Sequence, residues 1–201
     1  MARKTGSHGD ITGPAIRAAA LSLFARSGYA AVSMRELASE VGVQAGALYL
    51  YTPDKQTLLF DMLRDNMQRA LEAWEDARIE GTPAEQLETF VRFHVNYHVD
   101  RSDEIYVAYM ELRNLTPENF EQIEGLRRDY EAEVEAILVA GQKSGDFKLA
   151  DIRVSTMALI AMLNGVMTWY REGGRLSRGR IQQIYWDMAK QMVLALSLIH
   201  I

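Results

Sequence analysis

Residues 30–59 of the chain read AAVSMRELASEVGVQAGALYLYTPDKQTLL, and the order of residue types in this stretch decides the fold of the N-terminal part. Ser33 and Glu36 form a capping-box pattern, in which the serine hydroxyl serves an unpaired backbone amide and the glutamate reaches back. The pattern predicts a helix that runs to about Val41. Gly42 breaks this helix, and a short helix follows it. The spacing is typical of a helix-turn-helix.

The short helix, expected from about Gln44 to Tyr51, is predicted to present one side to DNA. A glutamine amide can hydrogen-bond base edges, small residues let the backbone come close, and tyrosine hydroxyls can reach phosphates. Lys55, at the start of the next helix, is expected to hold a phosphate. The residues expected to face outward are Gln44, Ala45, Gly46, Ala47, Tyr49 and Tyr51. An alternative is that the two tyrosines simply pack against the protein.

The composition of the chain favours an all-α fold. Of its 201 residues 48% are hydrophobic, which suffices for a buried core. Only four prolines occur, while good helix formers recur throughout. Helix start and stop signals predict about nine helices. They are expected at residues 12–28, 34–41, 44–51, 53–80, 81–99, 102–114, 116–141, 151–172 and from 177 onward.

Charge is distributed unevenly along the chain. The first 55 residues carry six lysines and arginines against four acids, whereas the remainder carries 16 against 23, and the net charge is −5. A mildly basic head on an acidic body is expected if only the head approaches phosphates. We therefore expect a DNA-binding helix-turn-helix domain at residues 1–55 and a helical effector-binding and dimerisation domain at residues 56–201.

The sequence also predicts a location for the protein. It has no cysteine, which excludes a disulfide framework and fits a reducing compartment. Residues 1–10 are polar and lack the apolar segment of a signal peptide. The apolar stretches near residues 157–167 and 192–201 are too short or too interrupted to cross a bilayer, which takes about 20 residues. A cytoplasmic protein without membrane contact is expected; whether residues 198–201 are native stays open.

Residues 11–60 resemble the DNA-binding domain of the TetR family. The likeness lies in the capped helix, the ELA-x-x-VGV core, the G-x-LY element and the Pro-x-Lys that begins the following helix. The resemblance implies that Ser33 and Arg35 contact backbone phosphates and that Gln44, Ala45 and Gly46 approach the bases. It also implies that Tyr49, Tyr51 and Lys55 fix the duplex in place. The sequence departs from the family at Thr52, where an aromatic residue is usual and whose loss is expected to loosen the junction, and at Gln44, where serine or alanine is commoner.

The last two predicted helices are apolar on more than one side, and a helix of this kind needs two burial surfaces. TetR-like regulators pair through these helices, so a homodimer is expected. Two heads then meet half-sites about 34–36 Å apart or at multiples of that distance. The alternative is a monomer whose own core surrounds both helices. The residues concerned are Ala158, Leu159, Ala161, Met162, Gly165, Val166, Ile184, Met188, Met192 and Leu196.

Polar and aromatic groups interrupt the apolar runs between residues 93 and 171, as in the lining of a ligand pocket. The segments YVAYMELRNL (106–115) and NGVMTWYREGGRL (164–176) look like the C-terminal domain of TetR regulators of fatty-acid and steroid catabolism. This resemblance implies an acyl-CoA effector, with its phosphates at Arg113, Arg171 or Arg175. A hydrophobic drug or another lipid fits the same residues. The expected ligand-binding residues are His94, Tyr97, His98, Tyr109, Met110, Arg113, Tyr130, Asn164, Trp169 and Arg171.

Other chemistry has little support in the sequence. His94 and His98 stand four residues apart and could share a metal ion with Glu111 or Asp100, but no third histidine or cysteine lies near them in sequence. No phosphate-binding loop, nucleophile elbow or dinucleotide fingerprint occurs. We therefore expect no metal, no cofactor and no enzymatic activity.

The sequence thus predicts a ligand-responsive transcriptional regulator, a repressor released from a palindromic operator by a hydrophobic effector. The competing hypothesis is a non-enzymatic helical ligand-binding or scaffold protein in which residues 11–60 merely pack and bind no DNA.

Overall fold

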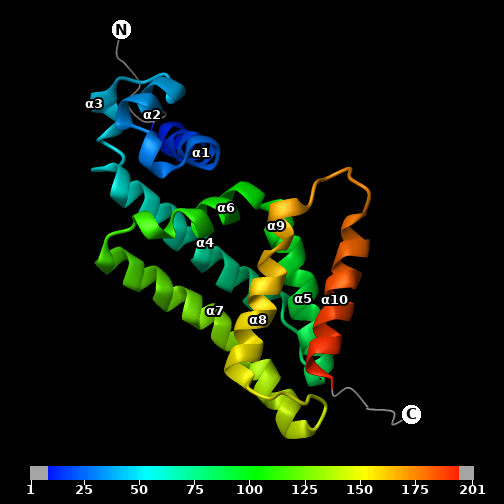
Figure 1. Ribbon diagram of the computed structural model, residues 1–201. Helices are drawn as coiled ribbons and strands as arrows, with labels where there is room; N and C mark the ends of the chain where they lie inside the picture. The colour runs from blue at the N-terminus through cyan, green and yellow to red at the C-terminus, as the bar shows by residue number, and fades with distance from the viewer. Residues whose placement is uncertain (1–8, 195–201) are drawn as a thin grey trace. The chain divides into compact units, whose positions relative to one another are not determined.

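The computed structural model describes residues 9–194, and within that range all regular structure is helical, as predicted (Figure 1). Two short 3-10 helices, η1 (Tyr29–Ala31) and η2 (Leu112–Asn114), accompany the α-helices. The α-helices are α1 (Gly9–Ser27), α2 (Met34–Val41), α3 (Ala45–Leu48), α4 (Lys55–Ala77), α5 (Pro83–Asp100), α6 (Ser102–Met110), α7 (Pro117–Ser144), α8 (Ile152–Asn164), α9 (Val166–Trp169) and α10 (Arg178–Val193).

Two predicted helices end earlier than expected. The helix after Gly42 ends at Leu48 because the carbonyl of Leu48 accepts from the amides of Tyr51 and Thr52, which tightens the chain into a turn. The helix expected over residues 151–172 is interrupted at Gly165 and ends at Trp169, since Tyr170 adopts an extended backbone conformation. With α8 and α9 taken together, the described residues contain the nine α-helices that the start and stop signals predict.

The chain divides into two compact units. The first contains residues 1–67 and 103–124, and the second contains residues 68–102 and 125–201. α4 and α7 each contribute residues to both units.

The core of the first unit is formed by α1, α2, α3 and the start of α4, together with Val107 of α6 and Ile123 of α7. These helices are labelled in Figure 1. Ser33 caps α2 by accepting a 3.1 Å hydrogen bond from the amide of Glu36, and Gly42 ends α2 in the left-handed conformation at φ 74°. Both features agree with the sequence pattern. The fully buried side chains that join these helices include Ile16, Leu23, Phe24, Leu37, Leu48 and Leu59.

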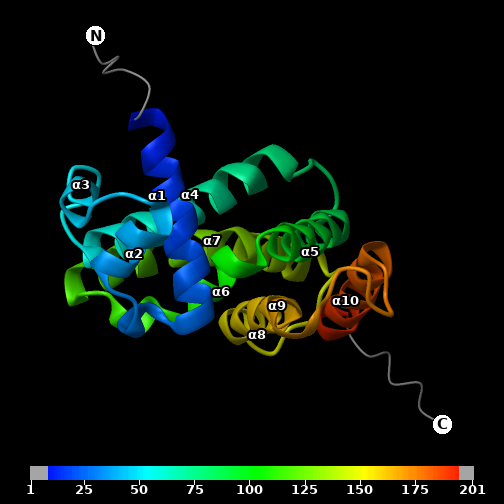
Figure 2. The same cartoon turned by 90° about the horizontal axis from the view of Figure 1, so that it is seen from above.

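In the second unit α5 packs against α8, α9 and α10, and the views in Figures 1 and 2 agree on this arrangement. α5 begins with a complete capping box between Thr82 and Glu85, and Pro83 occupies its first turn. Asp151 and Ser177 cap α8 and α10 through their side chains. These local signals fix where α5, α8 and α10 begin.

Candidate functional site

The turn between α2 and α3 orients the short second helix. Leu37 and Ala38 of α2 and Leu48 of α3 are buried and hold the two helices together. The amide of Val43 donates to the carbonyl of Ala38 at 2.9 Å, which closes the turn behind Gly42. A short second helix braced in this way is the geometry that enters a major groove.

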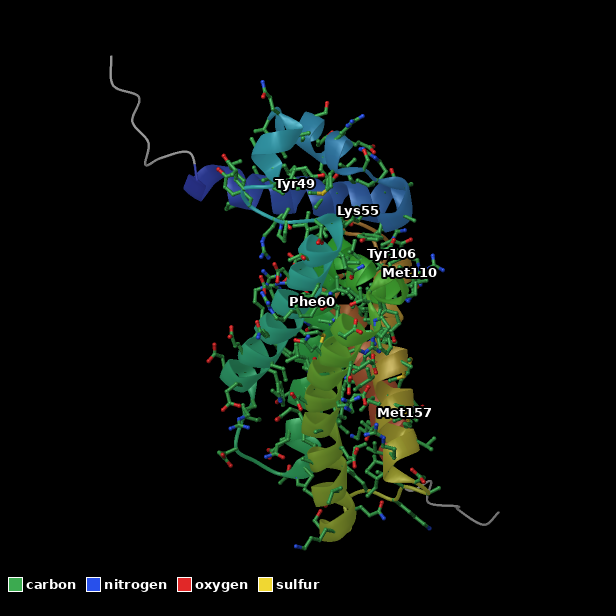
Figure 3. The ribbon with its side chains drawn as sticks, turned by 90° about the vertical axis from the view of Figure 1, so that its left-hand side faces the viewer. Tyr49, Lys55, Phe60, Tyr106, Met110 and Met157 are labelled. Atoms are coloured by element: carbon green, nitrogen blue, oxygen red, sulfur yellow. The ribbon has the colours of Figure 1, made fainter. Side chains whose placement is uncertain are left out.

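The side chains after this turn point outward. Gln44 and Gly46 are exposed, Ala45 is half-buried, and Tyr49 and Tyr51 are 52% and 41% exposed. Tyr49 is labelled in Figure 3. A Cβ added at Gly46 meets no atom within 4 Å, so the backbone there is open to an approaching partner. Ser33 and Arg35, at the start of α2, are also exposed.

Leu50 is a surface residue that sequence reasoning missed, and its side chain is 84% exposed. It was overlooked because a helix was expected to continue through Tyr51, whereas α3 ends at Leu48 and residues 49–51 form a turn that projects successive side chains outward. An exposed leucine beside two tyrosines suits an apolar partner such as a thymine methyl group.

Lys55 lies at the start of α4 and is labelled in Figure 3. Its Nζ donates to the carbonyls of Tyr29 and Val32 at 2.8 and 2.7 Å and lies 4.1 Å from the centre of the Tyr29 ring. Burial lowers the pKa of Lys55, and the nearby Glu111 carboxylate partly opposes this. Two of the three ammonium hydrogens are therefore already used inside the protein, which leaves one for a phosphate.

The junction before α4 is tied by Thr52 and Asp54. Thr52 is buried, and its hydroxyl donates to the carbonyl of Asp54 at 2.9 Å. Asp54 in turn caps α4 by accepting from the amide of Thr57 at 2.7 Å. The Thr52 side chain thus adds one local hydrogen bond to this junction, and the expected effect of losing the aromatic residue stays a prediction.

A buried polar cluster occupies the second unit. The His94 Nδ1 atom lies 3.0 Å from the Tyr130 hydroxyl, and its Nε2 atom lies 3.1 Å from Asn164 Oδ1. Because an amide oxygen only accepts, Nε2 carries the hydrogen and Nδ1 accepts from Tyr130. His98 Nδ1 donates to the carbonyl of His94 at 2.9 Å. The cluster joins α5, α7 and α8.

The two histidine rings stack with their centres 3.8 Å apart and an angle of 9° between them. Ring nitrogen lone pairs lie in the ring plane, so stacked parallel rings do not aim two nitrogens at one point. Both His94 nitrogens are already hydrogen-bonded. This geometry does not suit a shared metal ion.

Burial determines the ionisation of the cluster. It lowers the pKa of His98 to about 4 and the pKa of His94 well below its usual value, and the nearby His98 ring lowers the pKa of His94 further. Burial raises the pKa of Tyr130 far above that of a free phenol. All three side chains are therefore neutral at pH 7.

Acidification should destabilise the second unit. The pKa of His98 in the folded state lies below the value of about 6.5 expected in the unfolded state, so the unfolded chain binds the proton first. Stability is full above about pH 6.5 and falls as the pH drops towards 4; by pH 5 the loss from His98 is about 2 kcal/mol. His94 acts in the same direction. We expect urea midpoints to fall between pH 7.5 and pH 5, and a flatter profile for His98→Gln. A midpoint independent of pH contradicts this.

The ten predicted effector residues are not all brought together. His94, Tyr97, His98, Tyr130 and Asn164 are buried in the second unit. Trp169 and Arg171 belong to the same unit but are exposed, with Trp169 stacked on Tyr185 at 6.4 Å. The other three are exposed residues of the first unit, namely Tyr109, Met110 and Arg113.

Two aromatic neighbours of the cluster were missed. Phe90 lies 5.7 Å from His94 and 5.5 Å from Tyr130 between ring centres, and Trp74 lies 5.0 Å from Phe90. Phe90, His94 and His98 follow each other at intervals of four residues on α5, so the sequence did carry a signal that they share one face.

A groove of about 540 Å³ lies beside Trp74 in the second unit. Apart from Trp74 and Leu71 its lining is acidic, from Glu72, Glu75, Asp76 and Glu133. Four carboxylates disfavour an anionic ligand, so this groove does not suit the phosphates of an acyl-CoA.

α8 presents an apolar stripe to the surface. Val154 and Met157 are 58% and 48% exposed, and Ala158 and Ala161 are exposed as well, so the four side chains follow helical spacing on one side. Met157 is labelled in Figure 3. On α10, Met188 is 40% exposed, while Leu196 lies outside the described residues.

The stripe lies within Ile152–Trp169, the one described segment that by length and composition could cross a membrane, although the apolar stretch near residues 157–167 was expected to be too short; 28% of the segment is buried. Asn164, a polar residue within it, is hydrogen-bonded to His94 in the core. The segment has the features of a helix with one face in the core and the other available to a protein partner.

The fold and the exposed surface after Gly42 define a helix-turn-helix transcriptional regulator. Comparison with known proteins places it further. Residues 16–62 match the family model of bacterial regulatory proteins of the tetR family, and residues 80–193 match that of the tetracyclin repressor-like C-terminal domain. The chain belongs to the tetR family.

Three relatives illustrate the similarity. The fatty acid metabolism regulator protein of Bacillus subtilis is 26% identical over 154 residues, which cover 75% of this chain and 79% of the relative. A tetR-family regulatory protein from Rhodococcus RHA1 is 30% identical with a TM-score of 0.86, over 92% of this chain and 98% of its own. AibR, solved with isovaleryl coenzyme A and operator DNA, shares the fold at 24% identity and a TM-score of 0.80, over 88% and 97% of the two chains.

Proposed function

We propose that this tetR-family regulator is a cytoplasmic homodimeric repressor that binds palindromic operator DNA and releases it when a hydrophobic effector binds, and that it has no catalytic activity. The observation that carries the proposal is the outward-facing row at Gln44, Gly46, Tyr49 and Tyr51, set on a well-packed helix pair. Exposure of both tyrosines weighs against the alternative in which they only pack.

The proposed DNA contacts divide by chemistry. Gln44 and the small residues Ala45 and Gly46 approach base edges, which is where sequence is read. Ser33, Arg35, Tyr49, Tyr51 and the remaining hydrogen of Lys55 bind phosphates and set the register. These contacts make binding dependent on salt.

For the effector we propose an acyl-CoA thioester. The named metabolism of one relative and the bound ligand of AibR support this class. Within the second unit, the buried aromatic and histidine side chains of α5 supply the apolar lining proposed for the acyl chain, and exposed Arg171 is the proposed partner of its phosphates. The roles of Tyr97, Trp169, Tyr109, Met110 and Arg113 remain predictions.

Selection of duplexes from a randomised pool tests the proposal directly. We expect the protein to enrich a palindrome, to bind it more weakly as salt rises, and to release it when palmitoyl-CoA or isovaleryl-CoA is added. A thermal-shift series with CoA thioesters, fatty acids, steroids and drugs identifies the effector class, because a ligand of the native state raises the melting temperature. Failure to enrich any sequence at moderate salt would refute the regulator.

The homodimer is tested on the α8 stripe. Met157→Glu places a charge where the proposed interface excludes water, so we expect the dimer dissociation constant to rise roughly a hundredfold or more. Val139→Glu is the matched control, since Val139 is 44% exposed on α7, outside the stripe. Sedimentation velocity at micromolar concentration should find a monomer for the first variant and a dimer for the second. The reverse result places the interface elsewhere.

A further inference from the structure

The first unit contains a buried carboxylate that contacts the loop before α2. Glu111, which follows α6, is 5% exposed. Its Oε1 atom accepts from the backbone amide of Tyr29 at 3.1 Å, and its Oε2 atom accepts from the Asn114 side chain at 2.6 Å. A buried carboxylate is costly unless its oxygens are hydrogen-bonded, and both oxygens have such a partner here.

Lys55 holds the same loop by binding two of the loop's backbone carbonyl groups. Its ammonium group donates to the carbonyls of Tyr29 and Val32, so a cation binds the carbonyl of Tyr29 while an anion binds its amide. The Tyr29 ring adds an edge contact with Phe24, at 5.3 Å between ring centres. Tyr29 is thus fixed through its amide, its carbonyl and its ring.

A second attachment joins α4 to the residues after Glu111. The side-chain amide of Gln56 donates to the carbonyl of Asn114 at 2.8 Å and accepts from the amide of Thr116 at 3.3 Å. Residues 111–116 are therefore bonded both to the loop before α2 and to the first turn of α4.

We propose that Glu111 is a positioning residue for operator binding, which holds residues 28–32 and thereby sets the orientation of α2 and the reading turn behind it. The inference rests on the proposed function. Val32 immediately precedes Ser33, the cap of α2, so a shift of the held loop displaces the start of α2 directly. Glu111 itself touches no DNA in this role.

The position of the segment in the chain gives the contact a regulatory consequence. The chain enters residues 111–116 from α6 and leaves them into α7, the helix that carries Tyr130. Any displacement of α6 or α7 therefore reaches the loop before α2 through the bonds of Glu111 and Gln56. Coupling between sites is carried by hydrogen-bond networks among other contacts, and the bonds of residues 111–116 form such a network.

The test compares Glu111→Ala with Glu111→Gln and with the control Glu121→Ala, which alters an exposed glutamate on α7 in the same unit. Hydrogen–deuterium exchange of residues 28–32 reports the hold on the loop without DNA. Affinity for a duplex selected with the wild-type protein reports positioning. We expect Glu111→Ala to accelerate exchange at Tyr29 and to lower the affinity for the duplex about tenfold, which corresponds to the loss of one charged hydrogen bond. Glu111→Gln should recover part of both, and the control should change neither.

The outcomes are separable. Unchanged exchange in Glu111→Ala overturns the hold, whether or not any duplex is found. Faster exchange with duplex affinity within twofold of wild type overturns the positioning role. A wild-type protein that selects no duplex refutes the proposed function instead. If Glu111→Ala does not fold, Asn114→Ala is measured in the same way. This variant removes one of the two hydrogen bonds of the Glu111 carboxylate and should lower the affinity for the duplex about threefold.

Discussion

Replacing Gly46 with leucine should abolish operator binding while leaving the fold intact. A Cβ at Gly46 meets no protein atom within 4 Å, so the new side chain points into the space that the proposed DNA backbone and bases occupy. Gly46 also lacks a positive φ, and leucine is the better helix former, so the stability of the first unit should not fall. We expect the operator dissociation constant to rise roughly a hundredfold or more.

The series Gly46→Ala and Gly46→Leu provides its own control. Fluorescence anisotropy on the selected duplex should show affinity falling as the side chain grows, whereas thermal melting should stay at or above the wild-type temperature. Binding by Gly46→Leu within threefold of wild type would mean that another surface reads the DNA.

The second large effect is expected at Gly141 of α7. A Cβ there lies 2.0 Å from Cδ2 of the Phe147 ring, which is 4% exposed, and Phe147 also donates its amide to the Gly141 carbonyl. Because the Phe147 ring is buried, it must shift within packed surroundings to admit the new methyl group, and Gly141→Ala should cost about 3 kcal/mol in the free energy of unfolding. The melting temperature of the second unit should fall by about 10 °C.

Gly125→Ala is the matched control, on the same helix, where the added Cβ meets only the end of the Arg128 side chain at 3.9 Å. Alanine has the higher helix propensity, so a gain of about 0.5–1 kcal/mol is expected. Differential scanning calorimetry distinguishes the two variants. Equal melting temperatures would show that Phe147 can move aside at no cost.

Local signals in the sequence predicted most of the fold. Ser33 caps α2 as its pattern indicates, and Thr82, Asp151 and Ser177 cap helices that begin close to the predicted positions, because a cap depends on residues only two or three positions away. The length of α3 was mispredicted because the chain leaves the helix after Leu48 in a hydrogen-bonded turn that the pattern of apolar residues does not reveal.

The contacts within the sites could not be read in the same way. Lys55 was expected to face a phosphate, but its ammonium group binds carbonyls 23 and 26 residues earlier in the chain. His94 was identified as a polar group in an apolar run, yet its partners Tyr130 and Asn164 lie 36 and 70 residues away. Pairings at such separations follow from helix packing, which a periodicity does not specify.

The hydrogen bonds from Tyr130 through His94 to Asn164 run in one direction, each group donating to the next. If one of α5, α7 and α8 shifted along another by one turn, their leucines and valines could still pack favourably, since dispersion contacts do not depend on which apolar side chain is the partner. A neutral imidazole has one donor and one acceptor, and both are satisfied in only one alignment of the three helices. The hydrogen bonds of His94 thus select one packing register of the three helices among several that would bury similar apolar area.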